Sequence, residues 1–311
     1  MKKPDLEKVR KTLKQTDFPL LVIVEIVAGC NLACIMCPQK TMKRAKGIMD
    51  IKLFEKICKE IAHKGPETQL WMTIMGEVFT LGQRAIDYII TARELGVPQI
   101  IINTNGVLLN KKLIDKLLKA QPDKIYFGID AATKKTYDKI RIGGDFKKVQ
   151  ANVLYLIKRK KELKLEKPEI YAQFIVMDEN RHEEKAFKKY WLNKGVIIKI
   201  RQKLGWGKGV EAKNLSLPQS SRNIPCPWLV RTVSIHWTGD VAACDGDYEG
   251  NYYAGNIKHQ PIQKIWLGEL KKRRDRHLRG DFSFPTCLEC NDWQCGLSEF
   301  YYPKQIKSKK S

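Results

Sequence analysis

The feature that most constrains the fold is a regular alternation of short apolar runs and longer amphipathic stretches over the first 200 residues. Runs rich in β-branched residues predict six strands, at residues 20–27, 69–74, 99–103, 124–129, 169–176 and 196–201. Apolar residues at three- and four-residue spacing predict helices at residues 51–63, 82–95, 111–119, 146–163 and 182–194. Such strands indicate an α/β fold with a parallel sheet covered on both faces. Six units predict a partial (β/α)6 barrel or an open doubly wound sheet, because a closed barrel of this kind needs eight.

Residues 202–225 interrupt this alternation. The stretch contains GWGKG and NLSLPQSSRNIP, in which glycine, proline and serine are typical of a linker. Five cysteines, a hairpin pattern in VSIHWTGDVAAC and one helix near residues 262–278 follow it. The sequence therefore predicts an N-terminal extension (1–19), the partial barrel (20–201), a linker (202–225), a small cysteine-rich α+β domain (226–300) and a basic tail (301–311).

The nine cysteines indicate metal or redox chemistry rather than a disulfide framework. Neither a signal peptide nor an apolar run long enough to span a membrane is visible, so we expect a cytoplasmic protein in a reducing compartment. The net charge of +23 attracts anions and favours a small-molecule substrate that is itself anionic, although a solvated lysine-rich surface explains the same charge. No recognised RNA-binding motif supports a nucleic-acid partner.

The segment AGCNLACIMCP places Cys30, Cys34 and Cys37 directly after the first predicted strand. Ligands bind at the carboxyl ends of the strands in such a sheet, and this loop lies there. Three thiolates on a four-iron cluster would leave one iron open for a ligand that is not protein. A zinc site with a distant fourth ligand such as His63, or plain structural cysteines, are the alternatives. Cys58 lies on the apolar face of its helix and is expected in the core.

CNLACIMC is similar to the CxxxCxxC motif of the radical S-adenosylmethionine (radical SAM) superfamily, and companion motifs follow it in order. MGEV (75–78) resembles the segment that contacts the methionine amine, and NTNG (103–106) resembles the family's Thr-Asn-Gly. GID (128–130) resembles a Ser-x-Asp near the cofactor, and YDKIR ends in an arginine that can reach the cofactor carboxylate. The resemblance implies a TIM-like partial barrel and a [4Fe–4S] cluster that binds S-adenosylmethionine. The residues expected to contact this cofactor are Gly76, Glu77, Asn105, Asp130, Arg141 and, at the rim end of the fifth strand, Gln173.

Three positions depart from the family pattern. Met75 and Val78 stand where the amine-binding segment has glycine and proline, and Gly128 replaces the serine. Backbone carbonyls of the segment can still accept hydrogen bonds from an ammonium group, so we expect S-adenosylmethionine to bind with altered geometry. The loss of the serine hydroxyl removes one expected contact.

The later cysteines resemble the SPASM/Twitch extension of radical SAM enzymes, which holds auxiliary iron–sulfur clusters. Five cysteines cannot supply the eight ligands of two fully ligated clusters, so one auxiliary [4Fe–4S] cluster is expected. The spacing is similar to that of aminocyclitol dehydrogenases of the Twitch group and implies as ligands Cys226, Cys244, Cys287 and Cys290, with Cys295 as a further candidate. Asp245 stands where sulfatase-maturing enzymes carry the catalytic base.

The resemblance implies an oxidoreductase that cleaves S-adenosylmethionine reductively to a 5′-deoxyadenosyl radical and abstracts a substrate hydrogen, while the auxiliary cluster accepts an electron. We expect a sugar or aminocyclitol-type alcohol as substrate, and flavodoxin or ferredoxin as electron donor. The alternatives are a peptide or protein maturase of the RiPP or sulfatase type, a redox-neutral epimerase, and an RNA-modifying enzyme. A non-catalytic iron–sulfur electron carrier or sensor is the alternative from another class.

Overall fold

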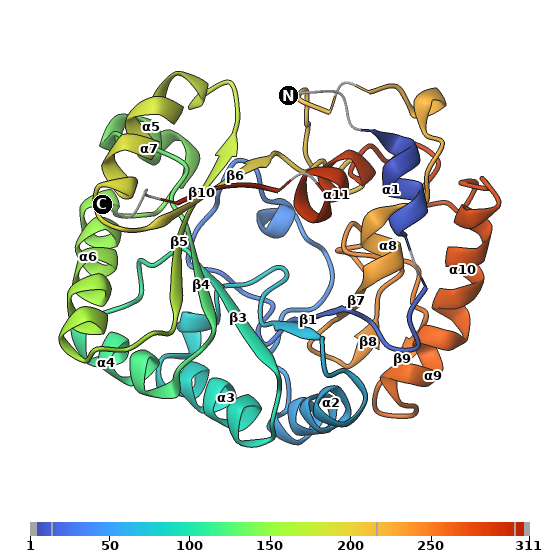
Figure 1. The fold of residues 1–311 in the computed structure, drawn as a ribbon, viewed down its shortest axis with the longest axis horizontal. Helices are drawn as coiled ribbons and strands as arrows, with labels where there is room; N and C mark the ends of the chain where they lie inside the picture. The colour runs from blue at the N-terminus through green and yellow to red at the C-terminus, as the bar shows by residue number, and fades with distance from the viewer. Residues whose placement is uncertain (1–4, 14, 216, 302, 308–311) are drawn as a thin grey trace.

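A curved sheet with helices along its outer face dominates the computed structural model, which describes residues 5–13, 15–215, 217–301 and 303–307 (Figure 1). Six parallel strands form its centre: β1 (Leu21–Val24), β2 (Gln69–Trp71), β3 (Gln99–Thr104), β4 (Lys124–Gly128), β5 (Glu169–Val176) and β6 (Ile197–Gln202). The outer helices are α2 (Ile51–Lys64), α3 (Gln83–Glu94), α4 (Lys111–Ala120), α6 (Phe146–Glu162) and α7 (Glu184–Leu192). The α/β class predicted from the alternation is confirmed. A short helix, α5 (Lys134–Ile140), was not predicted.

α2, α4 and α6 begin where a side chain caps them, and each outer helix turns an apolar face toward the sheet. Asn110, for example, precedes α4 and accepts a hydrogen bond from the Leu113 N–H over 2.9 Å. The buried residues of these helices and the outward side chains of the strands form one large core, which includes Cys58 as expected. Side chains of the opposite sheet face lie inside the curve, where Trp71, Tyr126 and Tyr171 stack with ring centroids 5.4 and 4.3 Å apart.

The C-terminal region extends the same sheet. β7 (Thr232–Ile235) pairs in parallel with β1, and β8 (Asp240–Val241) and β9 (Gly255–Asn256) follow it in antiparallel order. β7 and β8 form the predicted hairpin. At the opposite edge, β10 (Lys304–Ile306) pairs antiparallel with β6, so the described residues form one ten-stranded sheet.

Short helices complete this region. They are α1 (Leu6–Thr12), α8 (Pro227–Arg231), α9 (Ile262–Leu267), α10 (Glu269–Leu278) and α11 (Trp293–Phe300). α1 packs against α8 and α11 through a small core that contains Val9, Val230 and Trp293 (Figure 1). The prediction of a single helix near residues 262–278 is wrong in one respect. The backbone turns at Gly268, so the segment forms two helices, α9 and α10.

Parts of three predicted segments lie outside the described residues: 1–4 and 14 of the extension, 216 of the linker, and 302 and 308–311 of the tail. Across the ranges that are described, every helix is too short or too polar to cross a bilayer.

Candidate functional site

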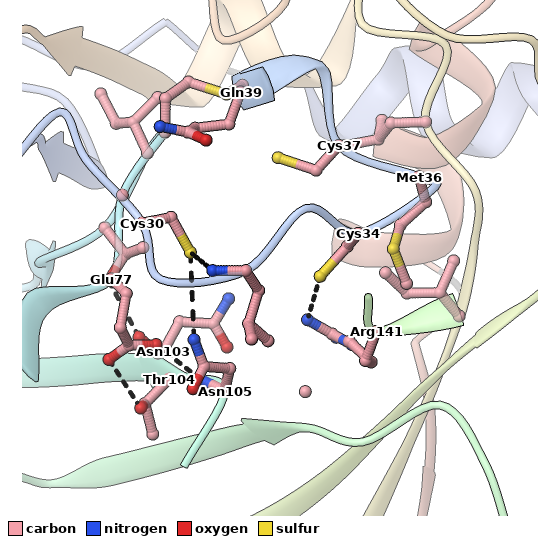
Figure 2. A pocket seen from close by; sticks show the side chains of 18 of the residues that line it. Cys30, Cys34, Met36, Cys37, Gln39, Glu77, Asn103, Thr104, Asn105 and Arg141 are labelled. Atoms are coloured by element: carbon pink, nitrogen blue, oxygen red, sulfur yellow. Dashed lines mark hydrogen bonds between the residues drawn. The ribbon is translucent and has the colours of Figure 1, made fainter. Parts of the chain in front are cut away.

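A cavity of about 160 Å³ opens where the parallel strands end. Cys30, Cys34 and Cys37 line it from the loop after β1 (Figure 2). Of the predicted cofactor residues, those that also line it are Gly76, Glu77, Asn105, Arg141 and Gln173. The structure therefore brings the three thiols together with Glu77 and Asn105 from the loops after β2 and β3, Arg141 from the end of α5 and Gln173 from β5. His63 lies exposed in the last turn of α2 and does not line this cavity.

The cysteine loop is fixed by backbone hydrogen bonds. Ala33 N–H donates to the Ile142 carbonyl over 2.9 Å, and Cys37 N–H donates to the Cys34 carbonyl over 3.1 Å. Burial raises the pKa of the Cys30 thiol and raises that of Cys37 to about 11. These thiols are therefore protonated at neutral pH until a metal displaces the protons, which is the usual behaviour of cysteine ligands.

Glu77 connects the loops that follow β2 and β3. Its carboxylate accepts hydrogen bonds from the Thr104 hydroxyl over 2.8 Å and from the Asn105 N–H over 2.7 Å. Its own N–H donates to the Gly29 carbonyl over 2.9 Å, and the preceding Gly76 lies so close to the Val27 carbonyl that a side chain has no room. Burial raises the pKa of Glu77. Both residues thus hold the edge of the cavity against the cysteine loop.

Asn105 reaches the cysteine loop from the next strand. Its amide nitrogen donates to the Asn31 side-chain oxygen over 2.9 Å and lies 3.9 Å from the Cys30 sulfur. Two further side chains that line the cavity each have one buried polar atom with no partner among the described residues, namely the Asn103 oxygen and the Gln39 amide nitrogen (Figure 2). A polar ligand would satisfy both atoms, so the cavity fits a cofactor such as S-adenosylmethionine.

Arg141 points into the cavity from the end of α5. Its Nε donates to the Asp130 carboxylate over 2.9 Å, and its Nη1 lies 3.5 Å from the Cys34 sulfur. Although burial opposes the charge, the Asp130 carboxylate raises the pKa of Arg141 above its ordinary value. Asp130 thus orients the arginine rather than lining the cavity itself. At Gly128, a Cβ would overlap the Arg141 guanidinium. This position of the arginine therefore requires glycine in place of the serine expected from the resemblance.

Arg201 and Trp206 are among the cavity residues that were missed from the sequence. Arg201, at the end of β6, donates to the Gln173 side-chain oxygen over 3.3 Å and pairs with Glu299 over 3.4 Å. Trp206 belongs to the predicted linker and donates from its indole to the Met36 carbonyl over 3.1 Å. The only signals were the basic residue after an apolar strand and an aromatic residue between glycines, and neither is specific.

A second, smaller cavity of about 30 Å³ lies in the C-terminal region. The four cysteines predicted to hold an auxiliary cluster all line it: Cys226, Cys244, Cys287 and Cys290. They are free thiols in this structure. Burial raises the pKa of Cys226 to about 11 and raises that of Cys244 well above its ordinary value. Cys295 is buried elsewhere, with its sulfur 3.8 Å from the Lys203 carbonyl, and does not line this cavity.

A buried arginine tests whether this cavity fits a cluster. Arg222 lines it, is 6% exposed, and has no hydrogen-bond partner at Nε or Nη1. Within the described part of the chain, no carboxylate forms an ion pair with it. A buried cation without a counter-charge is costly, and four thiolates around an iron–sulfur core supply a net negative charge. The residues present therefore fit a cluster.

Asp245 follows Cys244 and is half-buried, and its carboxyl accepts a hydrogen bond from the Ser234 hydroxyl. Burial raises the pKa of Asp245 to about 6. It lines a third cavity together with Cys244 and Trp206, and Trp206 also lines the first cavity. The predicted base thus lies on the side of the auxiliary cysteines that faces the first site.

Comparison with protein families gives two matches. The model of the Radical SAM superfamily matches residues 24–188, and the model of an iron-sulfur cluster-binding domain, SPASM, matches residues 226–291. A tungsten-containing aldehyde ferredoxin oxidoreductase cofactor-modifying protein from Pyrococcus furiosus is 24% identical over 314 residues, which cover 86% of each chain. An AdoMet-dependent heme synthase from Methanosarcina barkeri is 26% identical over 152 residues, or 47% of this chain and 41% of its own.

Two solved structures share the fold. BtrN in complex with AdoMet and 2-DOIA superposes with a TM-score of 0.61 at 18% identity, covering 89% of this chain and 94% of that chain. SuiB of Streptococcus suis bound to precursor peptide SuiA gives a TM-score of 0.67 at 14% identity, covering 93% of this chain and 73% of that chain. At these identities the likeness concerns architecture only.

Proposed function

The chain belongs to the radical SAM superfamily, and from that premise we propose that it is an oxidoreductase that converts a small alcohol to a carbonyl compound. The observation that carries the proposal is the pair of cysteine-lined cavities, one at the strand ends and one beyond β8. The matched families imply a [4Fe–4S] cluster with S-adenosylmethionine and auxiliary iron–sulfur binding.

In the first cavity, Cys30, Cys34 and Cys37 hold the cluster. When bound there, this cluster and S-adenosylmethionine would supply the radical chemistry that removes a hydrogen atom from a substrate carbon. The loop of Gly76 and Glu77 receives the methionine amine, and Arg141 binds the methionine carboxylate. Trp206, packed over the cysteine loop, excludes water from this space.

In the second cavity, Cys226, Cys244, Cys287 and Cys290 hold one auxiliary cluster. Oxidation of the alcohol to a carbonyl compound removes two electrons and two protons in total: a hydrogen atom from carbon, then one electron, which an auxiliary cluster held by these cysteines would accept, and one proton from oxygen. Asp245 accepts that proton. Its burial and its raised pKa support this role, because a base whose pKa is near the working pH transfers protons efficiently.

The proposed substrate is a sugar or an aminocyclitol-type alcohol. BtrN, which shares the fold, was crystallised with AdoMet and 2-DOIA. Flavodoxin or ferredoxin is the proposed source of the electron that initiates each turnover.

Anaerobic reconstitution with iron and sulfide tests this proposal. We expect about eight irons per chain, reductive formation of 5′-deoxyadenosine, and transfer of deuterium from a carbon-labelled alcohol into that product. Cys30→Ala should abolish the cleavage. Cys290→Ala should keep the cleavage, lower the iron content to about four, and stop carbonyl formation.

The outcomes discriminate between the candidate functions. About four irons in the unaltered chain would contradict the auxiliary cluster, and four irons without cleavage of S-adenosylmethionine would contradict the enzyme altogether. An inverted alcohol in place of a carbonyl compound would identify an epimerase.

A further inference from the structure

We propose that Arg222 acts through the auxiliary cluster: it is the permanent cation that raises the reduction potential of that cluster and so favours electron transfer out of the substrate. The inference rests on the proposed function in one respect, namely that the cavity of Cys226 and Cys244 holds a cluster. It concerns a residue just before the cluster-binding domain, at the end of the predicted linker.

The surroundings of Arg222 hold its guanidinium beside the cysteines. The guanidinium carbon lies 4.2 Å from the centre of the Phe282 ring and 5.8 Å from that of the Trp293 ring. Its Nη2 lies 3.4 Å from Nδ1 of His277, and the same ring nitrogen lies 3.3 Å from the N–H of Cys226. Aromatic faces bind an arginine without neutralising it, so the full charge remains at the cavity.

Arg222 differs from the buried arginines of the first cavity region, each of which has a carboxylate. Arg44 pairs with Glu25, and Arg141 pairs with Asp130. Neither an aspartate nor a glutamate is among the side chains that line the auxiliary cavity. Two guanidinium nitrogens of Arg222, Nε and Nη1, are buried and have no hydrogen-bond partner in the part of the chain that the structure describes. An anion held in the cavity would supply the partner that these two nitrogens lack among the described residues.

A cluster ligated by four thiolates has a net charge of about −2 when oxidised and about −3 after it has accepted one electron. A fixed cation in a buried setting stabilises the more negative state, and therefore raises the reduction potential. The carboxyls of Asp245 and Asp292 line the neighbouring cavity and act in the opposite direction. Arg273 also lines the auxiliary cavity, but Glu269 lies 3.5 Å from its Nε and offsets its charge. Arg222 is the cation there that no carboxylate of the described residues offsets.

A redox titration of the auxiliary cluster alone tests the proposal. The full chain with Cys30→Ala, Cys34→Ala and Cys37→Ala is reconstituted anaerobically, and the midpoint potential of the remaining cluster is followed by electron paramagnetic resonance. Adding R222Q to this triple variant should lower the midpoint potential of the cluster. Adding R222K instead should give a potential between that of the triple variant and that of the R222Q protein. R231Q is the matched control, because Arg231 also lies on an aromatic ring, 5.1 Å from the centre of Phe300, but does not line the cavity. The cluster of the triple variant with R231Q should have the same midpoint potential as that of the triple variant alone.

An unchanged or raised potential in R222Q would overturn the role of Arg222 and leave the proposed function intact. If R222Q does not retain iron, R222K decides the question, and an unchanged potential there overturns the inference equally. Failure of the triple variant with native Arg222 to assemble any cluster would instead contradict the auxiliary cluster on which the proposed function depends.

Discussion

At the scale of single residues, Gly128 shows how the cofactor cavity is built around one arginine. The guanidinium of Arg141 occupies the space where a side chain of residue 128 would lie. Asp130 holds this guanidinium in place. The Nη1 of Arg141 lies 3.5 Å from the sulfur of Cys34. The glycine that departs from the family's serine is therefore coupled to the position of the cation that we propose binds the methionine carboxylate.

Gly128→Ala should displace Arg141 and destabilise the protein by about 1–3 kcal/mol, the usual cost of overpacking a filled site. Urea denaturation measures the stability, and calorimetric titration of the reconstituted protein should show weaker binding of S-adenosylmethionine. Gly29→Ala is the matched control, because the nearest atom to its Cβ would be a Val27 methyl at 3.9 Å. A Gly128→Ala variant as stable as the unaltered chain would mean that Arg141 has another position available.

At the scale of elements, a buried ion cluster joins α11 to β6. Glu299 of α11 pairs with Lys199 over 3.0 Å and with Arg201 over 3.4 Å. The neighbouring cations lower the pKa of Glu299 although burial opposes its charge. This cluster attaches the C-terminal helix to the strand whose end lines the first cavity.

Glu299→Gln leaves two buried cations without a counter-charge and should cost about 3–5 kcal/mol of stability. The loss should shrink in a chain that already carries Lys199→Met, which a double-mutant cycle by urea denaturation measures. Glu162→Gln, which breaks a pair with Arg159 at the surface, should cost far less stability because water screens an exposed pair. Equal losses from the two glutamine substitutions would contradict a structural role for the buried cluster.

The sequence determined these elements unevenly, for physical reasons. β5 was predicted residue for residue because its apolar run is long and clearly bounded, whereas α5 has only seven residues and lies within a motif. The pairing of β7 with β1 joins residues more than 200 positions apart, and no local pattern encodes it. The two cysteine sets were predicted from their spacing and its resemblance to the radical SAM and SPASM/Twitch patterns. Arg201 and Arg222 acquire a role only when the fold places them beside a cavity.

At the scale of the whole molecule, the net charge of +23 favours approach of an acidic redox partner. Reduction of the clusters by an acidic flavodoxin should therefore slow by about tenfold or more between low and high salt, because screening removes the long-range attraction. Stopped-flow absorbance measures this rate at about 50 and about 500 mM sodium chloride, where screening of the charges is weak and strong, respectively. An uncharged photoreductant should show no such dependence. Equal rates with flavodoxin at both salt concentrations would show that encounter is not steered by charge.

The strand pairing between β1 and β7 bears on how such a protein can evolve. A C-terminal cassette that merely followed the barrel could be exchanged between genes by recombination at the linker. Here β7, the first strand of the C-terminal region, pairs with the edge of β1. Replacing that region would therefore leave the backbone of β1 unpaired at the centre of the molecule. Insertions that preserve the β1–β7 register are tolerated more easily than replacement of the whole segment. We therefore expect the barrel and the cluster-binding region of this lineage to be inherited together and to diversify through their loops.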